Sequence, residues 1–141
     1  MRLWHYKLIP YLPKDMLVSQ WRECIAIKRQ WEKGTLKHRL VSYVMNYNKK
    51  YFRNYIYNVV LEFDKRHINF NEKLYEELID FCFEDGGVVS CNLMYPEHNT
   101  RYLQQCYYNL QEKYDRGIIT NDEWQLIHKN IYGEIVRSDD F

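Results

Sequence analysis

The sequence predicts a mainly α-helical protein that folds as a single compact domain over residues 1–141. Apolar side chains recur at intervals of three and four residues in several segments. Most of these segments begin or end at a capping residue, a glycine or a proline. The hydrophobic content of 46% is enough for a chain of 141 residues to bury a core of its own. No segment shows the sustained alternation of apolar and polar residues that is typical of a β-strand.

The first long helix is expected from Lys14 or Asp15 to Lys33. Pro13 precedes it, Asp15 can cap its amino end and Gly34 ends it. Its apolar stripe consists of Leu17, Trp21, Cys24, Trp31 and the methylene stem of Lys28. Its more polar side carries Ser19, Arg22, Glu23, Ala26, Arg29, Gln30 and Lys33. The preceding residues form an arm, interrupted by Pro10 and Pro13, that we expect to lie across this helix near Glu23.

Two further helices are expected in the middle of the chain, after a basic connection. The connection holds Lys37, His38 and Arg39. The second helix is expected from about Lys49 to Arg66, and the third from Glu72 to about Phe83 with Asn71 as its cap. Tyrosines at positions 43, 47, 51 and 55 repeat every four residues, which favours a packed helix edge over a platform for stacking bases.

The remaining segments read as a turn, a loop and two helices. Asp85-Gly86-Gly87 is a turn, and Tyr95-Pro96-Glu97-His98 is an extended loop. A helix is expected from Asn99 or Thr100 to about Asp115, with Gly117 as its stop. Thr120 and Glu123 form a capping box for the last helix.

Charge is divided unevenly along the chain, although the net charge is only +1. Residues 1–70 hold 14 Lys and Arg against 5 Asp and Glu, a net charge of +9, whereas residues 71–141 carry −8. Such a polarised molecule steers an anionic partner to one face. The alternative is that the two halves attract one another inside the fold.

The four cysteines indicate a reduced, cytoplasmic protein. They show no close pairing, and the amino end is too polar and too rich in proline for a secretory signal. No apolar run is long enough to span a membrane. A metal site from Cys82, Cys91, His98 and Cys106 is disfavoured because no C-x-x-C spacing occurs.

Glu23 is the most informative residue of the first helix. The residues three and four positions away are Ser19, Gln20, Ala26 and Ile27, so the usual stabilising ion pair is absent. Helix propensity alone can place an exposed glutamate. The other interpretation is chemical, because a carboxylate weakens phosphate binding by a basic surface but suits proton transfer or stabilisation of a sugar cation.

The opening MRLWHYKLIPYLPKDMLVSQWRE resembles the amino-terminal arm and first helix of the phage endonuclease V family, the pyrimidine-dimer DNA glycosylases. It is closer to a bacterial branch that begins Met-Arg-Leu-Trp-His. Further similarity to that branch lies in His38-x-x-Val41-x-Tyr43-Val44, in Tyr51–Arg66 and in Tyr95-Pro96-Glu97-His98. The resemblance touches most of the chain and implies an endonuclease V-like helical fold.

The resemblance also implies a mechanism that needs no metal or other cofactor. In that family the chain's own α-amino group is the nucleophile, and the glutamate of an Arg-Glu pair, here Arg22-Glu23, is essential to catalysis. An α-amino group has a pKa of about 7.7–8.0, so a useful neutral fraction exists at neutral pH. Arg2 is too large for normal removal of the initiator methionine, so Met1 is expected to supply the amine.

The predicted partner is double-stranded DNA, with or without damage. We expect the protein to bind it as a monomer and to have no membrane partner. The basic residues would contact phosphates and position the duplex without reading its sequence. The residues assigned to this role are Arg2, Arg22, Arg29, Lys33, Lys37, His38, Arg39, Lys49, Lys50 and Arg53. Recognition would come from a kinked, weakly stacked lesion that is easier to deform than normal DNA.

Three functions are compatible with these observations. The first is a glycosylase and abasic-site lyase with Met1 and Glu23 as catalytic residues. The second is a non-catalytic module on the same fold that binds nucleic acid or a nucleotide. The third is an interaction protein whose oppositely charged halves pair head to tail. A free amine within reach of Glu23 distinguishes the first from the others.

Overall fold

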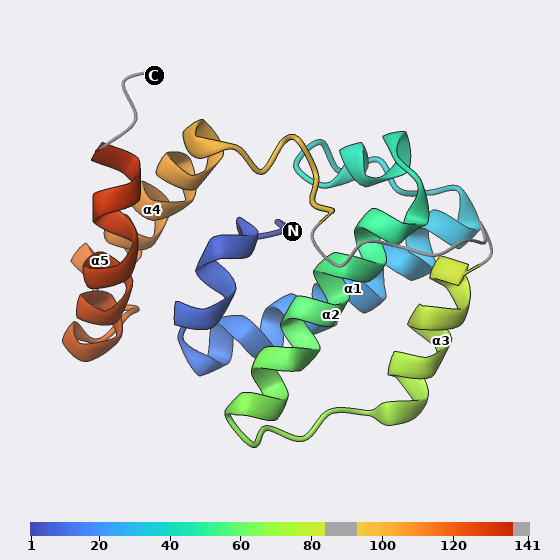
Figure 1. Ribbon diagram of the computed structural model, residues 1–141, viewed down its shortest axis with the longest axis horizontal. Helices are drawn as coiled ribbons and strands as arrows, with labels where there is room; N and C mark the ends of the chain where they lie inside the picture. Colours follow the sequence, from blue (N-terminus) through green and yellow to red (C-terminus); the bar gives the residue numbers. More distant parts are fainter. Residues whose placement is uncertain (84–92, 137–141) are drawn as a thin grey trace. The chain divides into compact units, whose positions relative to one another are not determined.

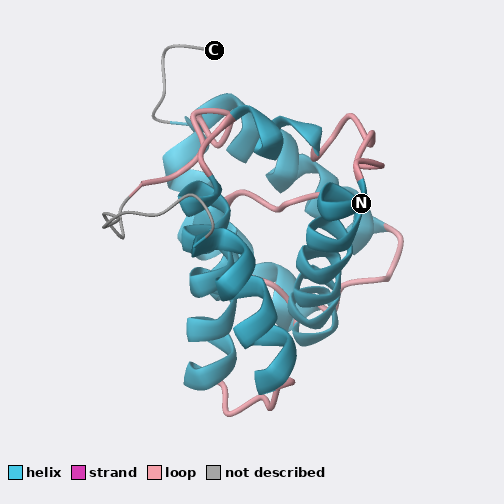
Figure 2. Ribbon diagram, turned by 90° about the vertical axis from the view of Figure 1, so that its right-hand side faces the viewer, coloured by secondary structure: helices cyan, strands magenta, loops and turns pink. Residues whose placement is uncertain are grey.

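Helices make up the regular structure of the protein. The computed structural model describes residues 1–83 and 93–136, and this part of the chain contains no strand (Figures 1 and 2). The elements are η1 (Tyr6–Tyr11), α1 (Lys14–Lys33), η2 (Ser42–Asn46), α2 (Lys49–Lys65), α3 (Glu72–Phe83), α4 (Thr100–Asp115) and α5 (Asn121–Val136), where η denotes a 3-10 helix. The prediction of a mainly α fold is confirmed. The predicted Asp85-Gly86-Gly87 turn lies outside the described residues.

Contacts along the chain form two compact units. One comprises Met1–Leu3 and Val18–Tyr95, and the other comprises Trp4–Leu17 and Pro96–Phe141. The first therefore holds most of α1 together with η2, α2 and α3, and the second holds η1, the start of α1, α4 and α5. A single domain over residues 1–141 stays a prediction.

Aromatic side chains form the centre of the first unit. Trp21 of α1 packs against Phe63 of α2, with ring centroids 6.2 Å apart. Trp31, near the other end of α1, lies 5.9 Å from Phe52 of α2 and 5.2 Å from Phe81 of α3. These contacts fix α1 against α2 over more than two helical turns, and the buried stripe of α1 includes Leu17, Trp21 and Cys24, as the sequence predicts.

Tyrosines cover the junction between η2 and α2. Tyr43, Tyr47 and Tyr51 surround the buried ring of Tyr95, at centroid distances of 5.2, 5.5 and 5.6 Å. They are packed, as expected, but they do not lie on one helix: Tyr43 belongs to η2, Tyr47 follows it and Tyr51 belongs to α2. Tyr55 is fully buried.

In the second unit α4 packs against α5, and α5 packs against η1. Leu103, Tyr107 and Leu110 are buried on α4, and Trp124 and Ile131 are buried on α5. The ring of Tyr107 lies 5.1 Å from that of Trp124. This arrangement follows from two amphipathic helices that are joined by a short turn.

The predicted helix ends are confirmed except at one cap. Gly34 has a φ of 70°, and the Thr35 N–H donates to Gln30 O at 2.9 Å, which is a Schellman end for α1. Thr120 and Glu123 exchange the two hydrogen bonds of a capping box, at 2.9 and 3.2 Å. Asp15 does not cap α1, because the helix begins one residue earlier and Pro13 O accepts the first helical hydrogen bonds.

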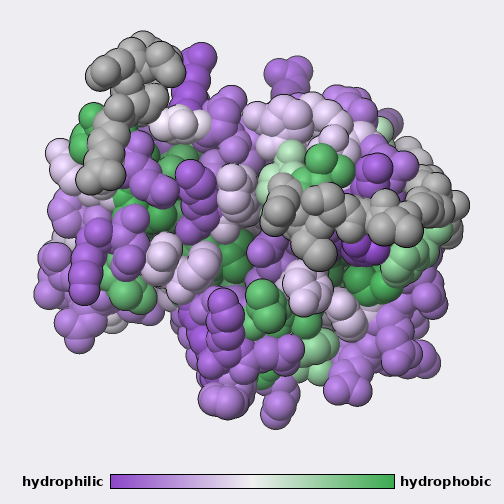
Figure 3. Space-filling model, viewed as in Figure 1, coloured by the Kyte–Doolittle hydropathy of each residue, from purple (hydrophilic) through white to green (hydrophobic). Residues whose placement is uncertain are grey.

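The surface seen in Figure 3 is largely hydrophilic, and hydrophobic side chains appear there in separate patches. In the described part of the chain, every helix is too short or too polar to cross a membrane.

Candidate active site

The amino-terminal arm contacts α1 directly at Glu23. The backbone N–H of Arg2 donates a hydrogen bond to Glu23 Oε2 at 3.1 Å. Consecutive backbone nitrogens are at most about 3.6 Å apart, so the α-amino nitrogen of Met1 lies within about 7 Å of the same oxygen. Met1, Arg2 and Glu23 are all half-buried. The structure thus brings the two predicted catalytic groups into one neighbourhood.

Gln20 links the arm to Glu23 and was missed by the sequence analysis. Its side chain is 1% exposed, and its Nε2 donates to Arg2 O at 3.0 Å and to Glu23 Oε2 at 3.2 Å. The hydroxyl of Tyr55, on α2, donates to Gln20 Oε1 at 3.2 Å. Glu23 therefore has a neutral polar partner three residues away on the same helix.

Three basic side chains share one side of α1. Arg22, Arg29 and Lys33 are exposed, and their spacing places them within about 40° of one another around the helix axis. Among the residues that the structure describes, none of the three forms an ion pair with a carboxylate. Glu23 is about 100° from Arg22, between this basic stripe and buried Gln20.

The other predicted phosphate ligands divide into two groups. Lys37, His38 and Arg39 are exposed in the connection between α1 and η2, where His38 Nδ1 accepts a hydrogen bond from Leu40 N–H at 3.3 Å. Lys49, Lys50 and Arg53 are half-buried on α2. Lys49 Nζ lies 3.9 Å from the ring centroid of Phe81, and the Arg53 guanidinium lies 5.1 Å from that of Phe83. Aromatic rings of α3 thus hold these two cations.

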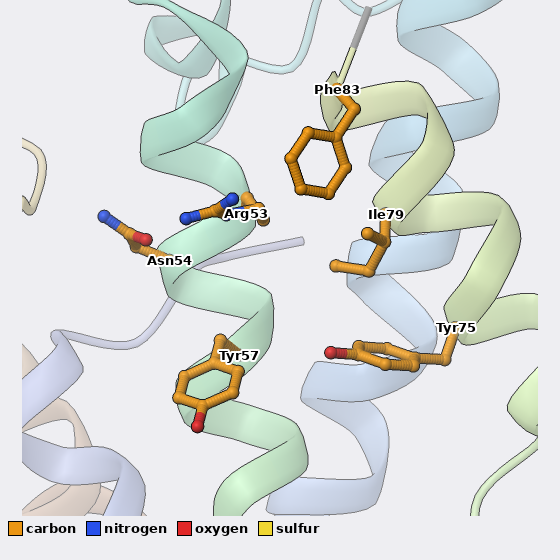
Figure 4. Close-up of a pocket in the computed structure, with 6 residues that line it drawn as sticks. All are labelled: Arg53, Asn54, Tyr57, Tyr75, Ile79 and Phe83. Carbon is orange, nitrogen blue, oxygen red and sulfur yellow. The ribbon is translucent and has the colours of Figure 1, made fainter. Parts of the chain in front are cut away.

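A pocket of about 290 Å³ lies between α2 and α3. Its walls are Arg53, Asn54 and Tyr57 from α2, and Tyr75, Ile79 and Phe83 from α3. Figure 4 shows the Tyr75 hydroxyl pointing across this pocket toward α2. Burial raises the pKa of that hydroxyl above its ordinary value, so it stays a hydrogen-bond donor at neutral pH.

Two buried histidines fasten η1 in the second unit. His98 Nδ1 accepts the N–H of Tyr6 at 3.2 Å, and His5 Nδ1 accepts the N–H of Lys7 at 3.1 Å. Burial lowers the pKa of His5 to about 4 and that of His98 to about 3. Both rings are neutral at physiological pH, and each accepts a hydrogen bond from the backbone, which is a structural role.

The three cysteines that the structure describes are buried. Cys24, Cys82 and Cys106 form no disulfide, and Cys91 lies outside the described residues. Burial raises the pKa of the Cys24 thiol, so this neighbour of Glu23 stays protonated. Residues 1–83 and 93–136 contain no group of three or more His, Cys, Asp or Glu side chains that could hold a metal ion.

Comparison with known proteins identifies a family. A family model described as pyrimidine dimer DNA glycosylase matches residues 1–76, which is more than half of the chain and includes the arm, α1, α2 and Glu23. No curated protein and no solved structure matched the chain in the corresponding comparisons. The resemblance to the pyrimidine-dimer DNA glycosylases is confirmed, while the assignment to a bacterial branch stays a prediction. The chain belongs to the pyrimidine dimer DNA glycosylase family.

Proposed function

We propose that the protein is a DNA glycosylase and abasic-site lyase that acts on pyrimidine dimers or related lesions. The α-amino group of Met1 is the nucleophile, and Glu23 is the catalytic carboxylate. Membership of the family implies a DNA substrate and supports glycosylase activity. Beyond what family membership supports, we propose the lyase step and the roles of Met1 and Glu23.

The observation that carries the proposal is the hydrogen bond from Arg2 N–H to Glu23 Oε2 at 3.1 Å. It limits the α-amine to within about 7 Å of the carboxylate, a span that one sugar carbon and its substituents can fill. In the described part of the chain Glu23 Oε1 accepts no hydrogen bond, so this oxygen is available to substrate.

The reaction has two bond-breaking stages. The neutral amine attacks C1′, a C–N bond forms, and the electrons of the glycosidic bond leave with the base, which takes up a proton. The sugar ring opens to give an imine. Glu23 stabilises the positive charge that develops on the sugar and then accepts the C2′ proton while the 3′ phosphate leaves by β-elimination. Water hydrolyses the imine and regenerates the amine.

The exposed cations of α1 are proposed to hold the duplex while this chemistry proceeds. Arg22, Arg29 and Lys33 lie on one side of the helix, next to Glu23, and have no carboxylate partner among the described residues. Each phosphate that they neutralise releases condensed counterions and adds to affinity. Lys37, His38 and Arg39 extend the same role into the following connection, and Arg2 adds a cation on the arm.

Replacement of Glu23 by Gln tests the carboxylate. Glu23→Gln keeps the side chain's size and an oxygen that can accept the Arg2 N–H, so the fold should survive. Cleavage of an abasic duplex should fall by about a hundredfold or more, the scale for a missing acid–base group. DNA affinity should stay or rise slightly, because an anion has left a phosphate-binding surface.

Glu32→Gln is the matched control. Glu32 lies on the same helix, is exposed and pairs with Lys28 at 2.8 Å, so its replacement should leave cleavage unchanged. Equal cleavage by Glu23→Gln and the parent protein would refute the catalytic role of Glu23. If neither protein cleaves and both bind DNA, the chain is a non-catalytic binding module on this fold.

A further inference from the structure

Gln20 has a position that neither helix propensity nor core packing requires. Its side chain is 1% exposed, yet its amide makes hydrogen bonds to Arg2 of the arm, to Glu23 of the same helix and to Tyr55 of α2. Tyr55 is itself fully buried. A buried amide that joins three segments is held firmly, because a buried polar group that loses its partner is not compensated by water.

The direction of each hydrogen bond follows from the chemistry of the partners. Arg2 O and Glu23 Oε2 are acceptors only, so the NH₂ end of the Gln20 amide faces both of them. The carbonyl end therefore faces Tyr55, and the Tyr55 hydroxyl must donate to it. The chain of donors runs one way, from Tyr55 through Gln20 to Glu23.

The same amide sets the separation between the arm and the carboxylate. One N–H of Gln20 holds the Arg2 carbonyl at 3.0 Å and the other holds Glu23 Oε2 at 3.2 Å, while Arg2 N–H closes the loop at 3.1 Å. Oε2 is thus occupied by two donors from the protein. Oε1 accepts no hydrogen bond in the described part of the chain, and it is the oxygen that we expect to exchange a proton with substrate.

We propose that Gln20 is a positioning residue that, with its amide orientation fixed by Tyr55, sets the geometry between the Met1 amine and Glu23. The inference rests on the proposed function of those two groups. Gln20 does not touch the reacting atoms. Without the hydrogen bond from Gln20 to Arg2 O, the arm could move and displace the Met1 amine. A displacement of a reacting group by about 1 Å can lower a reaction rate about a hundredfold.

The test separates positioning from ordinary structural support by using two apolar variants together. Gln20→Met keeps an unbranched side chain of similar length but removes the hydrogen bonds to Arg2 O, Glu23 Oε2 and the Tyr55 hydroxyl, so it should lose stability. Adding Tyr55→Phe removes one of the three groups that lost Gln20 as a partner and should recover part of the stability.

Two readouts are then compared in the parent and the double variant. The first is the single-turnover rate of borohydride-trapped imine on an abasic duplex, which should fall about 10–100-fold with DNA affinity unchanged. The second is hydrogen exchange of the Arg2 amide, measured by NMR without DNA, which should become faster because the arm is no longer held. A glutamine that serves stability alone would leave both readouts at the parent level under conditions in which the double variant is fully folded.

Tyr107→Phe is the matched control for a lost buried hydroxyl. Its hydroxyl lies 2.6 Å from His128 Nδ1, and the residue is 1% exposed. This variant should lose stability but keep both the trapping rate and Arg2 protection.

The two readouts keep the inference separate from the proposed function. If the parent forms no trapped adduct but the double variant loses Arg2 protection, the proposed function fails and the positioning by Gln20 stands. If the parent is active and the double variant matches it in rate and in Arg2 protection, the positioning role is refuted and the proposed function stands.

Discussion

At the scale of single residues, the site depends on polar groups that are buried rather than on charge pairs. Glu23 has no basic neighbour three or four positions away, which made it conspicuous in the sequence. The structure replaces the missing ion pair by two neutral donors, Gln20 Nε2 and Arg2 N–H. A search for polar as well as charged residues at those spacings would have found Gln20. Tyr55 could not be found this way, because it is 35 positions from Gln20.

The buried histidines predict a loss of stability in acid. The pKa of each ring is lowered in the folded protein, to about 4 for His5 and about 3 for His98, from an ordinary 6.5. The unfolded chain therefore binds protons first as the pH falls. The two neutral rings contribute fully to the free energy of unfolding above pH 6.5. This contribution is lost progressively below pH 6.5, by up to about 1.4 kcal/mol per pH unit for each ring.

Urea unfolding between pH 7 and pH 4 measures this loss. His98→Gln should flatten the dependence below pH 6.5, because it removes one of the two rings whose pKa is lowered by burial. An unchanged slope in His98→Gln would show that other groups, such as carboxylates, cause the acid lability.

At the scale of elements, the helix ends were predictable because their signals are local. Asn71 Oδ1 accepts the Leu74 N–H at 3.0 Å, and Gly117 has a φ of 79° just after α4, both as the sequence indicates. The end of α2 was less obvious, since His67 takes the left-handed conformation with a φ of 57°, a position where glycine is usual. The 3-10 helices η1 and η2 were not predicted, because they are only six and five residues long and carry no periodic pattern.

Replacing glycine by alanine should have opposite effects on stability at positions 34 and 133. Gly34→Ala forces alanine into a φ of 70° at the end of α1 and should lower stability by about 1 kcal/mol, although its Cβ would meet no atom within 4 Å. Gly133→Ala lies inside α5, also with no atom within 4 Å, and should raise stability by about 0.5–1 kcal/mol.

Thermal unfolding of the two variants checks the signs. Each change corresponds to a shift of about 2–4 °C in Tm. A gain in Tm for Gly34→Ala would show that α1 does not need a left-handed residue at its end. It would also indicate that α1 continues beyond Lys33 in solution.

At the scale of the whole molecule, the charge division agrees with the extent of the family match. Residues 1–70 carry +9, and the family model matches residues 1–76. Both observations favour the amino-terminal half as the part that binds DNA, which stays a prediction. The sequence could not tell that Lys49 and Arg53 rest on aromatic rings of α3, because those contacts depend on how α2 and α3 pack. A shared positive surface for Arg22, Arg29, Lys33, Lys37 and Arg39 stays a prediction.

Charge reversal on α1 should reduce the salt dependence of DNA binding. The double variant Arg22→Glu and Arg29→Glu removes two exposed cations, and the slope of log Kobs against log salt should become shallower by about two units. Arg101→Glu with Lys129→Glu changes the net charge equally but alters the acidic half, so the slope should stay near that of the parent. Equal effects in both variants would show a general charge effect rather than phosphate contacts on α1.

The central claim is that the amine of Met1, held within about 7 Å of Glu23 Oε2, is the nucleophile. Borohydride reduction during incubation with an abasic duplex, followed by mass spectrometry of the peptides, tests it most directly. We expect a covalent DNA adduct on the peptide that contains Met1, and none after the α-amine has been blocked. An adduct on a lysine side chain, or no adduct from a protein that binds the same duplex, would contradict it.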